Sequence, residues 1–342
     1  MMQYRLIDKI IDRLLIFLLV MSSGGMLFVL NRNIASIIFF VLLFLVVSFF
    51  GKPLKLNIFS SAVVTFLLLA FLGVINFSFA ANEQSLNKYG FHLLTVALTI
   101  LTIVHFKNNR NADLLLDGIY FVLKIILIHS IINFFLFFLV RNNLSVVGSI
   151  YHDYDTFLNI FFYSSSEKGV INILGLEFCR NQGLFWEPGV LQGFLNILFF
   201  IEAFILKRSR TVLITTALLI LSTYSTTGLA LLFIQIIYFM KSEFKINIAT
   251  FSVILICIPL YFLFTVNMNE KIYGERESSF QKRLFDLTQP FFIALEHPLT
   301  GTGLDIEQFQ NLRSEFYFNS NTLHNLNQKM GIQSKVSATD RG

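Results

Sequence analysis

The sequence predicts an all-α, polytopic integral membrane protein, a single domain over residues 1–342, and three observations support this prediction. The chain is 55% hydrophobic and only 14% charged, whereas soluble domains carry about 25% charged residues. Apolar runs of roughly 20 residues, the length that crosses a bilayer, follow one another along the sequence. Lysine and arginine gather in the short links between those runs.

The distribution of positive charge predicts how the chain is oriented. If the N-terminus is cytoplasmic, the links 51–57, 106–113 and 207–210 lie inside, and each holds at least two positive charges. The outer links 31–33 and 81–88 then hold one each. Because cytoplasmic loops of membrane proteins are enriched in lysine and arginine, this pattern favours a cytoplasmic N-terminus. The net charge of +5 therefore reflects membrane orientation, and no nucleic-acid partner is expected.

Seven apolar runs are each predicted to form one spanning helix. They cover residues 14–30, 34–50, 58–80, 90–106, 116–140, 190–206 and 246–266. The first run has a basic lead but no small-residue cleavage site, so we expect a signal anchor that stays on the protein.

An eighth run, residues 211–240, lies between basic segments on both sides. One straight helix of this length would measure about 45 Å and would place one basic flank outside. Two short helices joined at STYSTTG (222–228) return both flanks to the cytoplasm. We therefore predict a hairpin and about nine transmembrane helices in all, with two larger external segments at 141–189 and 267–342. A polar hairpin tip at membrane depth must be buried in protein or line a wet cavity.

The segment CRNQGLFWEPG (179–189) places two charged side chains directly before a predicted span. Pro188 suits a first helical turn, and Glu187 complements the positive end of the helix dipole. One interpretation is therefore structural, a capping glutamate with a paired or snorkelling Arg180. The other is that Arg180 binds an anionic head group at the interface, with Glu187 orienting it or an acceptor hydroxyl. The sequence leaves both open.

The hinge 222–228 and the C-terminal segment hold further candidates. Ser225 and Thr227 belong either to a hydroxyl-rich turn that satisfies broken helix backbone, or to a phosphate cradle at a helix N-terminus. Arg276 and Arg283 are external cations that either sit on a solvated face or neutralise a diphosphate. His324 is either a surface residue or a base near neutral pH.

Lys124, His129 and the pair Asp153 and Asp155 are weaker candidates for functional residues. Lys124 and His129 lie inside the predicted span 116–140, where ionisable residues are functional candidates by default, although Lys124 is close enough to an end to snorkel. The pair Asp153 and Asp155 has the spacing of a metal-binding D-x-D, but such a spacing arises by chance. No metal site is predicted.

Taken in order, these features resemble the bacterial O-antigen polymerase (Wzy-type) and O-antigen ligase superfamily. The resemblance covers roughly residues 175–331 and rests on the loop 180–188 before a span, the hinge, Arg283, the turn 297–303 and His324 with Asn325. It implies a GT-C-like glycosyltransferase of the bacterial inner membrane, with both external segments periplasmic. The implied donor is an undecaprenyl-diphosphate-linked oligosaccharide, and no cofactor is expected.

The resemblance also implies roles for the candidate residues. Arg180, with Arg283 and Arg276, would clamp the diphosphate, and Ser225 and Thr227 would line the hinge side of the site. His324, or else Glu187, would take the proton of the acceptor hydroxyl during an inverting transfer. Membrane lipids and a chain-length regulator protein are the other expected partners.

Two alternatives stay open. A ligase differs from a polymerase only in passing the glycan to lipid A-core, and a lipid-linked oligosaccharide flippase or transporter would show paired broken helices in two related halves. The sequence shows one broken region and no repeat, which favours an enzyme. Members of the superfamily usually continue past His324 into further spans, whereas this sequence ends in the polar segment 327–342. We therefore expect a C-terminally truncated member.

Overall fold

The computed structural model describes most of the chain up to residue 243. The described residues are 6–50, 55–80, 83–109, 112–148, 153–164, 169–173, 176–243, and the single residues 265, 295, 298, 301, 303 and 304. The chain divides into two compact units, one formed by Met1–Ile37 with Asn111–Met268 and the other by Ile38–Arg110 with Asn269–Gly342. Apart from those single residues, the predicted span 246–266 and the segment 267–342 lie outside the described residues.

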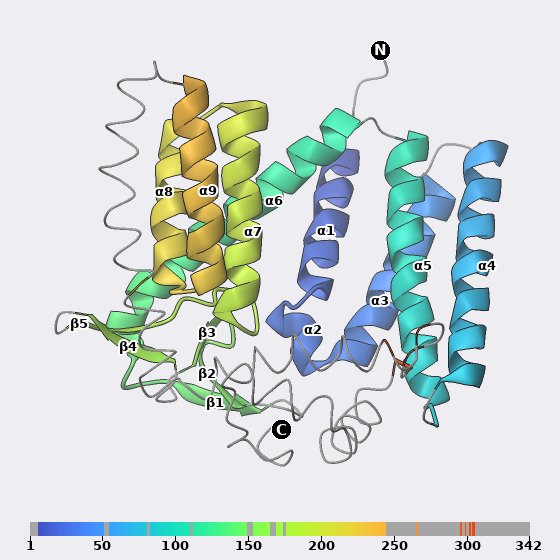
Figure 1. Cartoon of the computed structure of the whole chain (residues 1–342), viewed down its shortest axis with the longest axis horizontal. Helices are drawn as coiled ribbons and strands as arrows, with labels where there is room; N and C mark the ends of the chain where they lie inside the picture. The colour runs from blue at the N-terminus through green and yellow to red at the C-terminus, as the bar shows by residue number, and fades with distance from the viewer. Residues whose placement is uncertain are drawn as a thin grey trace. The chain divides into compact units, whose positions relative to one another are not determined.

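The first unit is a bundle of helices with small sheets at one end. Its helices are α1 (Leu6–Ser22), α2 (Met26–Leu30), α6 (Ala112–Val140), α7 (Pro188–Phe200) with its π-helical continuation η2 (Ile201–Leu206), α8 (Arg210–Ser222) and α9 (Thr226–Glu243). Helix α7 packs against α6, α8 and α9, and α1 packs against α6 (Figure 1). Leu191, Leu195 and Leu198 of α7 are almost fully buried, so α7 forms the centre of this unit.

The predicted span 14–30 is wrong as a single helix. Helix α1 ends at Ser22, and the hydroxyls of Ser22 and Ser23 donate to carbonyls of the preceding turn, each at 2.7 Å. Gly24 then adopts a φ of +122°, a conformation that glycine tolerates and other residues rarely adopt. The chain therefore turns at this position and forms the separate short helix α2.

The predicted hairpin in residues 211–240 is confirmed. Helices α8 and α9 lie against each other and run in opposite directions, joined by the short turn 223–225 (Figure 1). The hydroxyl of Ser209 accepts a hydrogen bond from the backbone N–H of Val212 at 3.3 Å and caps the start of α8. Tyr224 takes a φ of +47° at the turn, which allows the chain to reverse.

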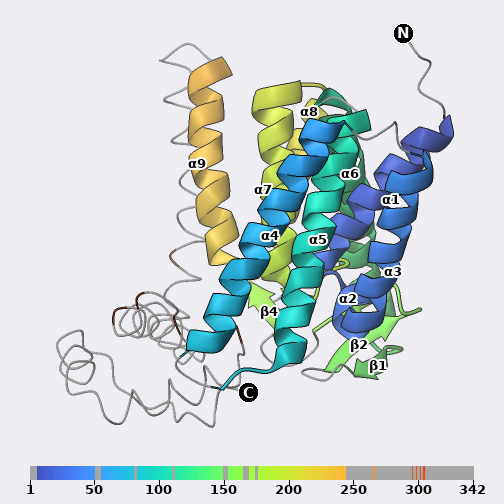
Figure 2. The ribbon, with the colours of Figure 1, turned by 90° about the vertical axis from the view of Figure 1, so that its right-hand side faces the viewer.

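The segment 141–189, which is predicted to be external, contains five short strands, so the described chain is mostly helical but not all-α. The strands are β1 (Ser145–Gly148), β2 (Asp153–Phe157), β3 (Phe161–Tyr163), β4 (Val170–Ile173) and β5 (Leu176–Cys179). The first three form an antiparallel sheet in the order β1-β2-β3, and β4 pairs with β5. Both views place the strands at the same end of this unit as α2 (Figures 1 and 2).

Aromatic side chains attach these strands to the helices. Tyr163 and Cys179 pack with Phe137 and Val140 at the end of α6. Met26 of α2 packs with two aromatic residues of β2 and β3. Each strand is too short to bury a face of its own, so the sheets are stable only against the helix ends.

The second unit contains the remaining helices. Helix α3 (Arg32–Leu45) begins in the first unit and continues into the second as the π-helical η1 (Val46–Phe50). Helices α4 (Leu56–Phe79) and α5 (Leu86–Asn109) pack side by side (Figure 2). An apolar cavity of about 790 Å³ lies between α3, α4 and α5.

Four helices among the described residues are long and apolar enough to cross a membrane. They cover Leu56–Phe79, Leu86–Asn108, Asp113–Val140 and Pro188–Leu206. Three shorter apolar helices cover Arg32–Ser48, Arg210–Ser222 and Thr226–Ser242. These helices indicate a membrane protein, and the count of nine spans stays a prediction.

Candidate functional site

The loop 179–189 is the point at which three parts of the first unit meet. Its first residues bond to the turn between α8 and α9, its middle residues bond to α6, and its last residues bond to the break between α1 and α2. The loop lies at the end of the bundle that carries the strands (Figure 1). Two of the sequence-predicted site residues, Arg180 and Glu187, belong to it.

Arg180 is half-buried and contacts the hinge directly. Its Nε donates to the carbonyl of Thr223 at 3.1 Å, and the neighbouring backbone N–H of Asn181 donates to the carbonyl of Ser222 at 3.1 Å. The backbone N–H of Arg180 donates to the carbonyl of Gly169 at 2.9 Å. The structure thus brings together Arg180 and the hinge, which the sequence analysis assigned to one site.

Asn181 anchors the loop on α6 and is a site residue that the sequence analysis missed. It is 2% exposed; its Nδ2 donates to the carbonyl of Ser130 at 2.8 Å, and its Oδ1 accepts from the N–H of Gly183 at 3.2 Å. Asn133 donates to the same Oδ1 at 3.3 Å. The sequence did hold a signal for a polar contact on α6: Ser130 and Asn133 lie about one helical turn apart inside an otherwise apolar span.

Gln182 adds an unusual feature to this buried polar cluster. Its side chain is fully buried, and neither of its two polar atoms has a hydrogen-bond partner among the described residues. The hydroxyl of Ser130 and the Oδ1 of Asn133 also have no hydrogen-bond partner among the described residues. Buried amides are normally hydrogen-bonded, so this cluster is a polar environment suited to ordered water or a polar ligand group.

The end of the loop uses the break between α1 and α2. The backbone N–H of Trp186 donates to the carbonyl of Gly24 at 3.1 Å, and the N–H of Met26 donates to the carbonyl of Leu184 at 2.8 Å. Phe185 between them is fully buried and stacks on Phe194 with ring centroids 4.9 Å apart. The broken first helix therefore supplies backbone partners that hold the loop.

The other predicted site residues in this region are Glu187 at the start of α7 and the hydroxyl residues Ser225 and Thr227 of the hinge. Glu187 occupies the N-cap position of α7, but its side chain makes no capping hydrogen bond. Burial, and then the negative charge of Glu187, raise the pKa of Tyr154, so this carboxylate lies beside β2. In the hinge Ser225 is buried and Thr227 is exposed, so only Thr227 of the two presents its side chain to the surroundings.

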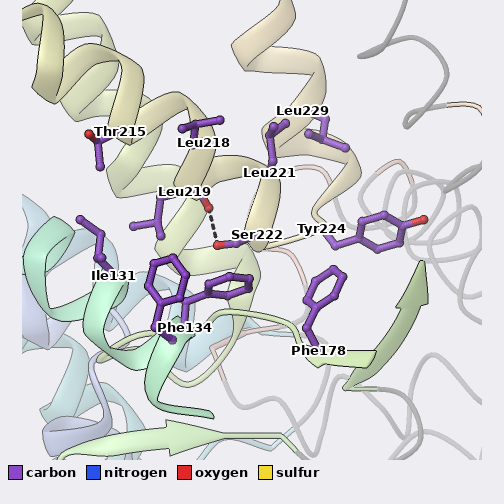
Figure 3. Close-up of a pocket in the computed structure, with 11 residues that line it drawn as sticks. Ile131, Phe134, Phe178, Thr215, Leu218, Leu219, Leu221, Ser222, Tyr224 and Leu229 are labelled. Carbon is purple, nitrogen blue, oxygen red and sulfur yellow. Dashed lines mark hydrogen bonds between the residues drawn. The ribbon is translucent and has the colours of Figure 1, made fainter. Parts of the chain in front are cut away.

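An apolar pocket of about 360 Å³ lies next to the hinge (Figure 3). It is lined by three residues of α6, Phe178 of β5, five residues of α8, Tyr224 and Leu229. Ser222 and Tyr224, which line it, flank Thr223, the residue whose carbonyl accepts the hydrogen bond from Arg180. The pocket thus presents an apolar wall with a guanidinium close to its hinge side, which suits a ligand with an apolar chain and an anionic group.

Lys124 and His129, the two candidates within the predicted span 116–140, both make contacts that have a structural role. The Nε2 of His129 lies 3.2 Å from the carbonyl of Ile160, and its ring stacks on Phe161 with centroids 5.0 Å apart, which ties α6 to the β2–β3 turn. The ammonium of Lys124 lies 5.4 Å from the centre of the Tyr120 ring. Lys124 therefore extends toward the start of α6, as the snorkelling interpretation predicts.

The remaining candidates fall into two groups. Arg276, Arg283 and His324 lie outside the described residues, so their roles stay predictions. Asp153 and Asp155 both lie on β2, and among the residues that the structure describes no group of three or more potential metal ligands is found.

The comparisons with known proteins add no relative to these observations. No protein-family model, no curated protein and no solved structure matches the sequence.

Proposed function

We propose that the chain is a surface-polysaccharide (O-antigen) polymerase, which joins undecaprenyl-diphosphate-linked oligosaccharide units by inverting glycosyl transfer. The observation that carries the proposal is the contact of Arg180 with the hinge carbonyl of Thr223, beside an apolar pocket at the strand-bearing end of the bundle. The resemblance of residues 175–331 to this superfamily supports the same function.

A lipid-linked diphosphate matches the two parts of this site. Its isoprenoid chain is apolar and would occupy the pocket lined by Phe134, Phe178 and Leu218. Its diphosphate would lie at the hinge, where the planar guanidinium of Arg180 is suited to phosphate oxygens. In this proposal Arg283 and Arg276 supply further positive charge, and Ser225 and Thr227 form the hinge side.

The transfer itself needs a base and a stabilised leaving group. The acceptor hydroxyl oxygen attacks the anomeric carbon from the face opposite the diphosphate, and the bond from that carbon to the phosphate oxygen breaks. The electron pair leaves with the diphosphate, where cationic side chains stabilise the developing charge. The hydroxyl proton passes to His324 or to Glu187. Glu187 is the N-cap residue of α7 and belongs to the same loop as Arg180.

The proposal includes an orientation in the bacterial inner membrane. The link 207–210 and the start of α1 share one end of the first unit, and they would be cytoplasmic. The loop 179–189, the hinge and the strands would then be periplasmic, where lipid-linked units are joined. Membrane lipids and a chain-length regulator are the partners that this arrangement implies.

One observation favours a transporter of the same lipid-linked oligosaccharide as the second candidate. Two broken helices, α1–α2 and α8–α9, both contact the loop 179–189. Transporters bind substrates at pairs of broken helices, but near the bilayer midplane. Here the loop and both breaks lie at one end of the bundle (Figure 1), which favours chemistry at the membrane surface.

Glycan laddering in a host with the matching repeat-unit genes and no polymerase of its own tests the proposal. We expect the full chain to give a ladder of surface lipopolysaccharide. Arg180→Ala should abolish the ladder, whereas Arg180→Lys should weaken it, because lysine keeps the charge but loses the planar fork. Arg141→Ala, an exposed arginine just after α6, is the matched control and should leave the ladder intact.

The glycan that accumulates on the lipid carrier or on lipid A-core distinguishes a polymerase from a ligase or a transporter. A host that lacks only its polymerase carries single repeat units on lipid A-core. A host that lacks only its ligase accumulates long polymer on the lipid carrier. Missing transporter leaves single units on the carrier at the cytoplasmic face. Rescue by this chain of the second or third defect but not the first, or a ladder unchanged by Arg180→Ala, would contradict the proposed polymerase.

A further inference from the structure

A further pocket of the first unit lies near the start of α6, far from the candidate site. Its volume is about 290 Å³, and it lies between α1, α6 and the link to α8. Its charged lining residues are Lys9, Asp12, Arg13, Asp117, Lys124 and Arg208. Asp117 precedes Phe134 of the hinge pocket by 17 positions on α6, which is about 25 Å along a helix.

The lining cations are held in place by specific contacts. The Nη2 of Arg208 lies 2.8 Å from the Oδ1 of Asp117. The guanidinium of Arg13 lies 3.5 Å from the centre of the Phe121 ring. The charged groups of Arg208 and Lys124 lie 5.6 and 5.4 Å from the centre of the Tyr120 ring. Arg208 is therefore paired with a carboxylate, whereas the aromatic contacts of Arg13 and Lys124 hold these cations without neutralising them.

The charges in the pocket do not balance. Four lining side chains are cationic and two are carboxylates, and a third carboxylate, Glu202, is hydrogen-bonded to the lining residue Tyr120, so a formal excess of one positive charge remains. Leu114 and Phe121 add apolar surface to the same lining. Such a pocket suits a ligand that joins an anionic group to hydrocarbon, and basic pockets between membrane helices bind anionic lipid head groups.

We propose that this pocket binds the phosphate head group of an anionic membrane phospholipid. The phosphate lies between Arg13, Lys124 and Arg208, and the first carbons of the lipid contact Leu114 and Phe121. The basic link 207–210 at the same end attracts anionic lipid to this surface. The inference does not depend on the proposed polymerase activity, because the two pockets lie at opposite ends of α6.

Lipid binding to the full chain, purified in a neutral detergent, tests this inference. Native mass spectrometry counts retained lipid, and thermal unfolding measures stabilisation by phosphatidylglycerol, phosphatidylcholine or inorganic phosphate. We expect phosphatidylglycerol to be retained and to raise the unfolding temperature more than phosphatidylcholine. Arg13→Gln and Lys124→Gln should each weaken its apparent affinity about tenfold.

The matched control is Arg141→Gln, an exposed arginine just beyond the other end of α6, which should bind phosphatidylglycerol like the wild type. Lys9→Gln serves as the lining variant should Arg13→Gln fail to fold. Equal binding of phosphatidylcholine, equal stabilisation by inorganic phosphate, or unchanged affinity in the lining variants would each overturn the assignment. Loss of glycan laddering with lipid binding intact would contradict only the proposed function.

Discussion

At the scale of single residues, Gly183 shows how the loop 179–189 depends on close approach. Gly183 has a φ of +55°, and a Cβ at this position would lie 2.5 Å from the hydroxyl oxygen of Ser130. A side chain would therefore strain the backbone and push the loop away from α6. The loop holds Arg180 against the hinge, so its position determines the geometry of the candidate site.

Gly183→Ala should lower the free energy of unfolding by at least about 1–2 kcal/mol, because alanine is disfavoured at positive φ and its methyl group meets Ser130. Gly193→Ala is the matched control: Gly193 lies inside α7 with open space where a Cβ would be added. That substitution should be neutral or stabilising by up to about 1 kcal/mol. Thermal unfolding in detergent measures both, and equal effects would contradict the close approach seen at Gly183.

Cys179 should react slowly with thiol reagents. Burial raises its pKa from 9.0 to about 11, although its sulfur also contacts the carbonyl of Ser164 at 3.4 Å. Because the thiolate is the reactive form, the raised pKa leaves about 100-fold less thiolate between pH 7 and 8 than an ordinary cysteine has. In a Cys257→Ser background, maleimide labelling should accelerate as the pH rises toward 11. Fast labelling of the folded chain at pH 7, at the rate of the unfolded chain, would contradict this.

At the scale of elements, the α8–α9 hairpin positions the hinge. Helix α8 has 13 residues and therefore measures about 20 Å, which is shorter than the hydrocarbon core of a bilayer. In the turn that follows it, the buried backbone carbonyl of Thr223 accepts the hydrogen bond from Arg180. The run 211–240 indicated a hairpin from charge alone, because both of its flanks are basic. That Arg180 and the hinge share a site was implied only by the resemblance, and charge did not indicate the contact with the carbonyl of Thr223, since Arg180 lies more than 40 residues away.

Cysteine labelling from either side of the membrane tests the hairpin. In a background with Cys179 and Cys257 replaced by serine, cysteines at Arg210 and Ser242 should react from the same side. A cysteine at Asn142, just after α6, should react from the other side and serves as the matched control. All three positions are exposed. Labelling of Arg210 and Ser242 from opposite sides would require one straight helix instead.

At the scale of the whole molecule, exposed apolar surface is the dominant feature. Helix α4 buries only 6% of its most apolar window, and side chains such as Leu67 and Phe71 are about 60% exposed. Soluble monomers rarely expose such continuous apolar surface, whereas lipid covers it in a bilayer. The chain should therefore stay in the membrane pellet after alkaline carbonate extraction and dissolve only in detergent, as shown by immunoblotting. Release by carbonate, together with a peripheral control protein, would contradict membrane insertion.

The sequence by itself determined the membrane class and the hairpin, whereas the resemblance of the loop 179–189 to O-antigen polymerases stays a prediction. Those features depend on composition, on charge at the ends of apolar runs and on residue order, which are local or averaged properties. The break at Gly24 was not predicted, although SSGG (22–25) is a recognisable local signal. Its apolar surroundings made one continuous span the simpler interpretation.

Only the tertiary structure decided which distant segments meet. The strands of 145–179 form because the end of α6 and helix α2 provide apolar surface, through Phe137 and Met26, that the short strands lack. Asn181 belongs to the site because its Nδ2 donates to the carbonyl of Ser130 of α6 at 2.8 Å, a contact that only the folded structure shows. The basic pocket likewise gathers Arg13, Lys124 and Arg208 from three segments. Contacts of this kind depend on long-range packing, and neither local periodicity nor local charge encodes them.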